Sequence, residues 1–322
     1  EQQPLSLSFF NEQSRPTEVS VPWPKQGNTF ISGNTPLGWT SRMLFGDIEI
    51  QTLDVGGKSL HVAQTMNVPD AKRAQINDWL TEAANSVVSL YGHFPVDQVQ
   101  ILVIPIGKRR EAIPWAEVQR AGRPAIHFFI DPSRPISEFK DDWTAVHELS
   151  HLLTPRIDYN DRWLSEGLAS YYQYVAKARA GLLTSDQAWQ KLRAGFARGR
   201  RVQSGHLRDS KSTRHLYWGG AAIYMLADMR LRELPKPQTL DQVLATLYQC
   251  CLPNNELWSA SEFMATLDKL SETKIFSQLL ANEAMARRFP IALADESRSD
   301  SQISRHIDDI FQTNIDLTKT ND

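Results

Sequence analysis

Cysteine is scarce in this sequence. The 322 residues include only Cys250 and Cys251, which are adjacent. Adjacent cysteines cannot supply the paired CxxC arrangement of a structural zinc site, and at best they form a strained vicinal disulfide. We interpret them as thiols of a core or an interface, and their oxidation state is left open. No disulfide framework is expected to hold the fold together.

Long hydrophobic runs and an excess of charge of one sign are also missing. No stretch of about 18 apolar residues occurs, which excludes a transmembrane helix of the usual kind. The formal net charge of −2 provides no field for binding DNA or RNA. We therefore expect no nucleic-acid partner, while the pattern predicts nothing about the oligomeric state.

An initiating methionine is absent, because the chain begins with Glu1. A removed secretory signal or a trimmed chain would each explain this start. Together with the low cysteine content, a removed signal favours a periplasmic or secreted location.

The remaining pattern predicts an α+β fold. Residues 1–68 contain short β-prone runs, such as 5–10, 48–50 and 60–62, which are separated by proline and glycine turns. A helix with apolar residues at 3.6-residue spacing should start at Asp70 and stop at Gly92. Two β-branched runs, 99–105 and 125–130, should be strands of one sheet. The segment between them is expected to be a loop, and it carries Lys108, Arg109, Arg110, Arg120 and Arg123.

From about residue 140 onward the apolar spacing is almost entirely helical. The expected helices cover 142–154, 161–179, 185–198, 216–233, 239–250, 261–271 and 275–288. We therefore expect three parts: a β-rich N-terminal portion at 1–68, a central domain at 69–250 and a helical C-terminal extension at 251–322.

The segment His147-Glu148-Leu149-Ser150-His151 has the spacing of a catalytic zinc site. Asp142 can cap its helix, which must end near Pro155. Histidines at i and i+4 project in one direction, so both imidazoles can bind one tetrahedral Zn²⁺. Glu148 is rotated by about 100° from His147 and is placed to act as a general base.

Glu166 is the predicted third metal ligand. It lies among apolar residues that should face a core, and a carboxylate in such surroundings needs a partner. The 14 residues after His151 are enough to turn the chain into an antiparallel helix beside the metal. Gly167 would permit a close approach there. The alternative, in which these histidines and Glu166 are solvated surface residues, conflicts with their apolar flanks.

These motifs resemble those of the gluzincin metallopeptidases of the aminopeptidase N superfamily, and most closely its glycyl aminopeptidase branch. The resemblance rests on HELSH at 147–151, WLSEGLASYY at 163–172, YWGGAAIYMLADMRLR at 217–232 and TLDQVL at 239–244. It covers roughly residues 70–250. It implies a thermolysin-like catalytic domain with a mixed sheet and one Zn²⁺ per chain.

By its position in these motifs, Tyr217 is the expected hydrogen-bond donor to the oxyanion, and His215 is a possible secondary donor. In such aminopeptidases a glycine-rich acidic segment holds the amino terminus of the substrate. Here the matching segment around 120–124 has no glutamate, which leaves Glu111 and Glu117 as candidates. The resemblance also suggests strand 125–130 as the edge that receives an extended peptide.

The predicted function is zinc-dependent hydrolysis of peptide bonds in a peptide or protein substrate, either aminopeptidase-like or as an endopeptidase of small peptides. One alternative is a catalytically inactive protein that keeps the gluzincin fold for binding or assembly. Another keeps the metal but acts on a different electrophile, such as an epoxide. The intact base Glu148 favours the enzyme.

Overall fold

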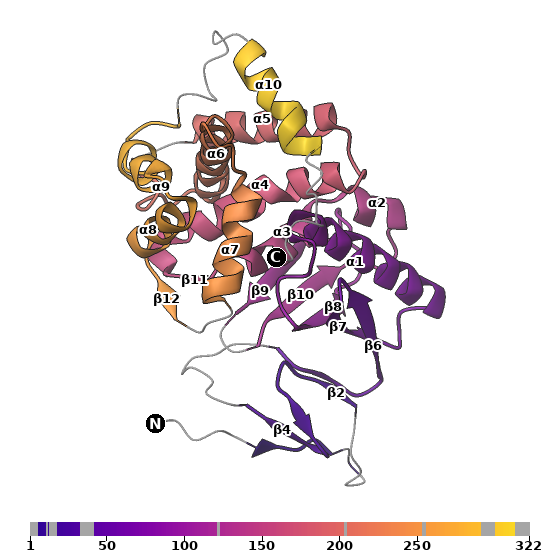
Figure 1. Ribbon diagram of the computed structural model, residues 1–322. Coiled ribbons are helices and arrows are strands. Elements are labelled where there is room, and N and C mark those ends of the chain that lie inside the picture. The colour runs from indigo at the N-terminus through magenta and orange to yellow at the C-terminus, as the bar shows by residue number, and fades with distance from the viewer. Residues whose placement is uncertain are drawn as a thin grey trace. The chain divides into compact units, whose positions relative to one another are not determined.

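The structure is a computed structural model that describes residues 6–10, 12, 18–32, 42–120, 123–202, 205–252, 256–290 and 300–312, without the side chains of 300–305. The chain divides into two compact units (Figure 1). The first consists of Glu1–Asn85 and Val96–Leu152, and the second of Ser86–Pro95 and Leu153–Asp322. Among the described helices, none combines the length and apolar character that crossing a membrane requires.

A five-stranded mixed sheet organises the first unit (Figure 1). Its strands are β6 (Ile48–Val55), β7 (Lys58–Thr65), β8 (Gln98–Pro105), β10 (Ala125–Ile130) and β9 (Trp115–Gln119), in that spatial order. The three central strands β7, β8 and β10 are parallel, whereas β6 and β9 run antiparallel to their neighbours. The predicted α+β class with a mixed sheet is confirmed.

The edge of this sheet differs from the prediction. Strand β10 is not an edge, because it lies between β8 and β9. The true edge is β9, which forms inside the charged stretch that the sequence pattern assigned to a loop. Charged and polar side chains are common on edge strands because one side of the strand faces away from the sheet. The charge of this stretch therefore concealed a five-residue strand.

Helix α1 (Asp70–Tyr91) packs on the sheet and begins and ends where the sequence predicts. Gly92 follows it with φ of +82°, a conformation that glycine adopts without steric cost. Trp79 of α1 meets Phe128 of β10 edge-on, with ring centroids 5.4 Å apart. Helix α2 (Ile136–Asp141), which was not predicted, adds Phe139 to the same aromatic cluster at 5.4 Å from Trp79.

Short strands make the N-terminal part β-rich, as predicted. They are β1 (Ser6–Leu7), β2 (Val19–Ser20), β3 (Lys25–Gln26), β4 (Thr29–Ile31) and β5 (Leu44–Phe45). Of the predicted run 5–10, Leu5 lies outside the described residues. The Ser20 hydroxyl accepts a hydrogen bond from Gln100 of β8 at 3.1 Å, so this part is tied to the sheet.

The second unit is mostly helical. Its helices are α4 (Trp163–Arg179), α5 (Ser185–Arg201), α6 (Thr213–Arg232), α7 (Leu240–Cys251), α8 (Ala260–Ser271), α9 (Ile275–Leu279) and α10 (Asp300–Gln312). The expected helix 275–288 is divided, because α9 gives way to a π-helical turn at Leu280–Ala284. Strands β11 (Arg156–Ile157) and β12 (Leu257–Trp258) pair in parallel.

Cys250 and Cys251 form a disulfide at the end of α7. Our interpretation of the pair as core or interface thiols is therefore wrong. Cys250 is exposed and Cys251 half-buried, since both fall in the last turn of the helix, beyond its buried stripe.

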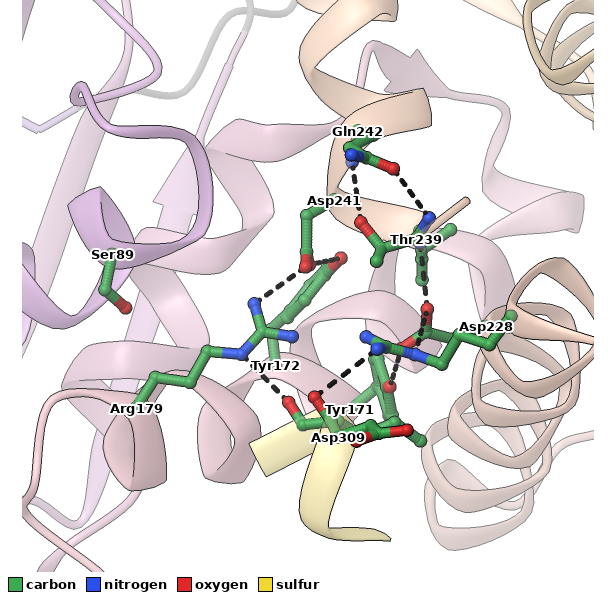
Figure 2. A network of polar contacts seen from close by, with 12 residues as sticks. Ser89, Tyr171, Tyr172, Arg179, Asp228, Thr239, Asp241, Gln242 and Asp309 are labelled. Carbon is green, nitrogen blue, oxygen red and sulfur yellow. Dashed lines mark hydrogen bonds and ion pairs between the residues drawn. The ribbon is translucent and has the colours of Figure 1, made fainter. Parts of the chain in front are cut away.

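Buried tyrosines and aspartates join the helices of the second unit (Figure 2). The Tyr171 hydroxyl donates to Asp228 at 2.8 Å, and the Tyr172 hydroxyl donates to Asp241 at 2.7 Å. Burial raises the pKa of both phenols, so they remain donors. Asp241 also pairs with Arg179 at 2.7 Å. Each buried carboxylate thereby has the charged and neutral donors that burial demands.

The same network holds α10. Arg179 Nε donates to the carbonyl of Ile310 at 2.9 Å, and Arg232 Nη1 donates to the carbonyl of Asp309 at 3.3 Å. Both carbonyls lie near the C-terminal end of α10, where cations interact favourably with the helix dipole. The last described helix is thus tied to α4 and α6.

Two glycines set the approach of α4 and α6. A Cβ atom on Gly167 would lie 2.5 Å from Gly220 Cα, and one on Gly220 would lie 2.4 Å from the Trp163 carbonyl oxygen. These helices therefore touch backbone to backbone. Glu166 precedes Gly167, and Tyr217 lies one turn before Gly220. This backbone contact therefore sets the backbone positions from which the side chains of Glu166 and Tyr217 project.

Replacing Gly167 by Ala should destabilise the protein by about 3 kcal/mol, because the backbone of α6 cannot move aside as a flexible side chain would. Urea unfolding measures this loss, with Gln190→Ala on the exposed face of α5 as the control. Zinc content should fall as well. Wild-type stability and zinc content in the variant would contradict a tight contact.

Candidate metal centre

His147 lies on a short helix that its neighbours start and stop. Helix α3 covers Thr144–Ser150, and the Asp142 carboxylate accepts a hydrogen bond from the Thr144 amide at 2.7 Å. After Ser150 the chain tightens into a 3₁₀ turn at His151–Leu153, ahead of Pro155. The expected helix 142–154 is therefore shorter, because the approach to proline ends the α-helical hydrogen bonding early.

The two histidines of the motif nevertheless stay together. Their ring centroids are 4.9 Å apart, and the ring planes are nearly perpendicular at 89°. Both side chains are buried, with His147 1% and His151 5% exposed. Trp143 packs edge-on against His147 with centroids 5.0 Å apart. This contact restricts the orientation of the first imidazole.

Glu166 completes a cluster of metal-binding groups with these histidines. One ligand atom from each of His147, His151 and Glu166 lies within 4.8 Å of the other two. Glu166 is half-buried at the start of α4. Two imidazole nitrogens and one carboxylate oxygen are a donor set that suits Zn²⁺ and leaves a fourth position for water. The residues present therefore fit this metal.

Glu148 lies on α3 beside His147 and is 8% exposed. It is not one of the three clustered ligand groups. A buried carboxylate next to a ligand, but outside the ligand set, has the placement that a general base requires.

Tyr217 and His215 both lie in the first turns of α6, but on different faces. Side chains two residues apart, such as these, point in directions about 200° apart around the helix axis. Tyr217 is half-buried on the side of Gly220, which meets α4. His215 is 1% exposed, and its Nδ1 is 3.0 Å from Ser210 Oγ. Burial lowers its pKa, so its imidazole is neutral at pH 7. The structure does not bring His215 onto the face of Tyr217, and the catalytic roles of both remain predictions.

Glu117, a candidate for holding a substrate's amino terminus, is already engaged. It forms an ion pair with Arg42 and lies 3.1 Å from Nδ1 of His127, its partner across β9 and β10. Burial, aided by the charge of Arg42, lowers the pKa of His127 to about 4. Glu111 is exposed. Residues 121 and 122 of the expected anchoring segment lie outside the described residues.

Arg120 contacts the candidate metal site, which the sequence pattern did not predict. Its Nη1 donates to the backbone carbonyl of His151 at 2.5 Å. Arg120 directly follows β9, so it links the edge strand to the turn that carries the second histidine. The basic residues of this stretch are evident in the sequence, but only the fold shows that Arg120 is the one that contacts the backbone of His151.

The segment that carries most of these residues is similar to a known peptidase family. Residues 145–223 match the model of the M61 glycyl aminopeptidase family. That segment includes the clustered histidines, Glu148, Glu166 and Tyr217. The predicted resemblance to the gluzincin peptidases is confirmed.

Several solved structures have a fold similar to that of this chain at low sequence identity. Native yeast LTA4 hydrolase superposes with a TM-score of 0.59 at 13% identity, over 91% of this chain and 48% of that one. The aminopeptidase N family protein of Idiomarina loihiensis gives 0.55 at 14% identity, over 94% and 55%. The M1 zinc metallopeptidase of Deinococcus radiodurans gives 0.53 at 15% identity, over 89% and 61%.

The chain thus spans about half to three-fifths of the length of these proteins. A search of curated proteins by sequence finds no match.

Replacing Arg120 by Gln should weaken zinc binding about tenfold, because residues that hold a ligand from outside the coordination shell typically contribute that much. Arg120→Lys should recover part of the affinity. Competition with a chelator measures both, and Arg110→Gln in the same basic stretch is the control. Equal affinity in Arg120→Gln and Arg110→Gln would rule out a positioning role.

Proposed function

We propose that this protein is a zinc-dependent peptidase. The cluster of His147, His151 and Glu166 carries the proposal, because its donor set is that of catalytic zinc sites with an open position. When bound there, Zn²⁺ would act as a Lewis acid toward water and the carbonyl group of a peptide bond. The match of residues 145–223 to glycyl aminopeptidases supports this chemistry.

Glu148 is the proposed general base. Its carboxylate takes a proton from the attacking water and then delivers that proton to the leaving amide nitrogen. Tyr217 is the proposed oxyanion donor. A phenol O–H donates without carrying charge, so it is suited to donate to the carbonyl oxygen as negative charge develops there.

The edge strand β9 is the proposed platform for substrate. It is the last strand of the sheet and lies against α3, which carries His147. Because β9 pairs with only one described neighbour, its other side can accept the backbone of an extended peptide. With Glu117 already paired to Arg42, we propose that a free amino terminus is not required.

Replacing Glu148 by Gln should lower peptide hydrolysis about 1000-fold, because the amide cannot accept the proton. Zinc content, measured by elemental analysis, should stay at about one ion per chain. The substrates are a mixed panel of peptides with free and acetylated amino termini, and Glu138→Gln on α2 is the matched control. Unchanged hydrolysis would remove Glu148 from the mechanism.

The same panel tests the alternative of an inactive binding protein. That alternative requires wild-type protein loaded with zinc to cleave none of the peptides. Its basis is that, of the two candidate anchors for the amino terminus, Glu117 is paired with Arg42 and Glu111 is exposed. The buried Glu148 beside His147 favours catalysis.

Replacing Tyr217 by Phe should lower kcat about 100-fold with little change in KM, because the lost hydrogen bond forms only as the oxyanion develops. Tyr248→Phe on α7 is the control, since it also removes one phenol oxygen. If Tyr217→Phe behaves like the control, Tyr217 has no role in the reaction.

A further inference from the structure

The first unit contains a cavity of about 430 Å³ away from the catalytic motif. One wall is the segment Val19–Lys25, and the other comes from β6, β7 and β8, with Arg123 and Pro124 at the side. The volume is enough for a small organic molecule. None of the clustered metal ligands lines this cavity.

Both signs of charge line the cavity, with an excess of positive charge. Arg123 donates from Nη1 to Gln98 Oε1 at 2.5 Å, which leaves its other N–H groups available. Lys25 lies over the Phe30 ring, 5.7 Å from the centroid. Neither cation forms an ion pair with a carboxylate among the described residues. Glu18 supplies the negative charge.

His61 adds no further charge to this lining. Burial and the nearby Arg123 lower its pKa, so the imidazole is neutral at pH 7. Its Nδ1 lies 3.1 Å from the Thr52 hydroxyl.

Gln100, which also lines the cavity, has a polar atom that the described residues leave unsatisfied. This lining residue is 3% exposed, and its Nε2 donates to Ser20 Oγ at 3.1 Å. Its Oε1 is buried without a hydrogen-bond partner in the part of the chain that the structure describes. A buried amide oxygen without a donor costs free energy, which a ligand N–H group would recover.

An apolar surface completes the lining. Pro22, Trp23 and Pro24 face the cavity from one segment, and Val99 lines it from β8. Such a surface accepts an aliphatic or aromatic side chain.

We propose that this cavity binds a free amino acid with an apolar side chain, as a site separate from the metal centre. The carboxylate pairs with Arg123 and Lys25, the ammonium group with Glu18 and Gln100 Oε1, and the side chain packs on Trp23 and the prolines. This inference goes beyond the proposed peptidase function and does not depend on it, since binding here requires neither zinc nor Glu148.

The test is calorimetric titration of the full-length protein with L-phenylalanine, its amide and its N-acetyl derivative. The expected affinity for L-phenylalanine is about millimolar, and both blocked compounds should bind at least about tenfold more weakly, because each lacks one charged group. Arg123→Gln should weaken binding of L-phenylalanine about tenfold, whereas Arg110→Gln should leave it unchanged.

Zinc removal separates this site from the metal centre. Binding that persists in chelator-treated protein and in the Glu148→Gln variant supports the cavity. Binding that disappears with zinc would place the ligand at the metal and overturn the proposal. So would an absence of heat at about 20 mM L-phenylalanine, or equal affinities in the two arginine variants. Loss of hydrolysis with binding retained would refute only the peptidase function.

Discussion

The backbone contact between Gly167 and Gly220 is the constraint on which the candidate site depends. A helix pair usually lies 8–10 Å apart because side chains separate the axes. Here a Cβ on either residue would overlap the opposite backbone. The contact lets α4 present Glu166 and α6 present Tyr217 from neighbouring turns. Glu166, the proposed third ligand, and Tyr217, the proposed oxyanion donor, both lie close to this contact. The proposed chemistry therefore depends on how these two helices pack.

Support for that packing comes from the polar core behind it. Tyr171 and Tyr172 follow Glu166 on α4, and their hydroxyls bond to carboxylates of α6 and α7. Hydrogen bonds have narrow geometric limits, so they fix rotation and translation of α4 more closely than apolar contacts do. Arg179 extends the constraint to α10 through the carbonyl of Ile310. This constraint on helix position accounts for the burial of two aspartates where apolar residues would cost less free energy.

The sequence allowed good predictions at several places where the signal is local. Helix spacing, the stop at Gly92 and the His147–His151 pair depend on neighbours within a few residues. Local signals were also misjudged, as at the early end of the helix predicted over 142–154. The other failures at the site lie where a distant partner decides. Strand β9 exists because β10 pairs with it, and its own charges suggested a loop. The contact of Arg120 with His151 spans 31 residues. The role of Gly167 was foreseen, but Gly220 as its counterpart was visible only in three dimensions.

The charged stretch before β10 shows why composition alone could not assign its function. Its residues serve different ends that depend on position. Glu117 is neutralised by Arg42, Arg120 holds the His151 carbonyl, and Arg123 reaches a separate cavity. A uniform basic loop would repel a substrate's ammonium group. Because these charges have separate contacts, each acts at short range, and its effect depends on the group that it contacts. The net charge of the stretch therefore does not determine which substrates approach the candidate metal site.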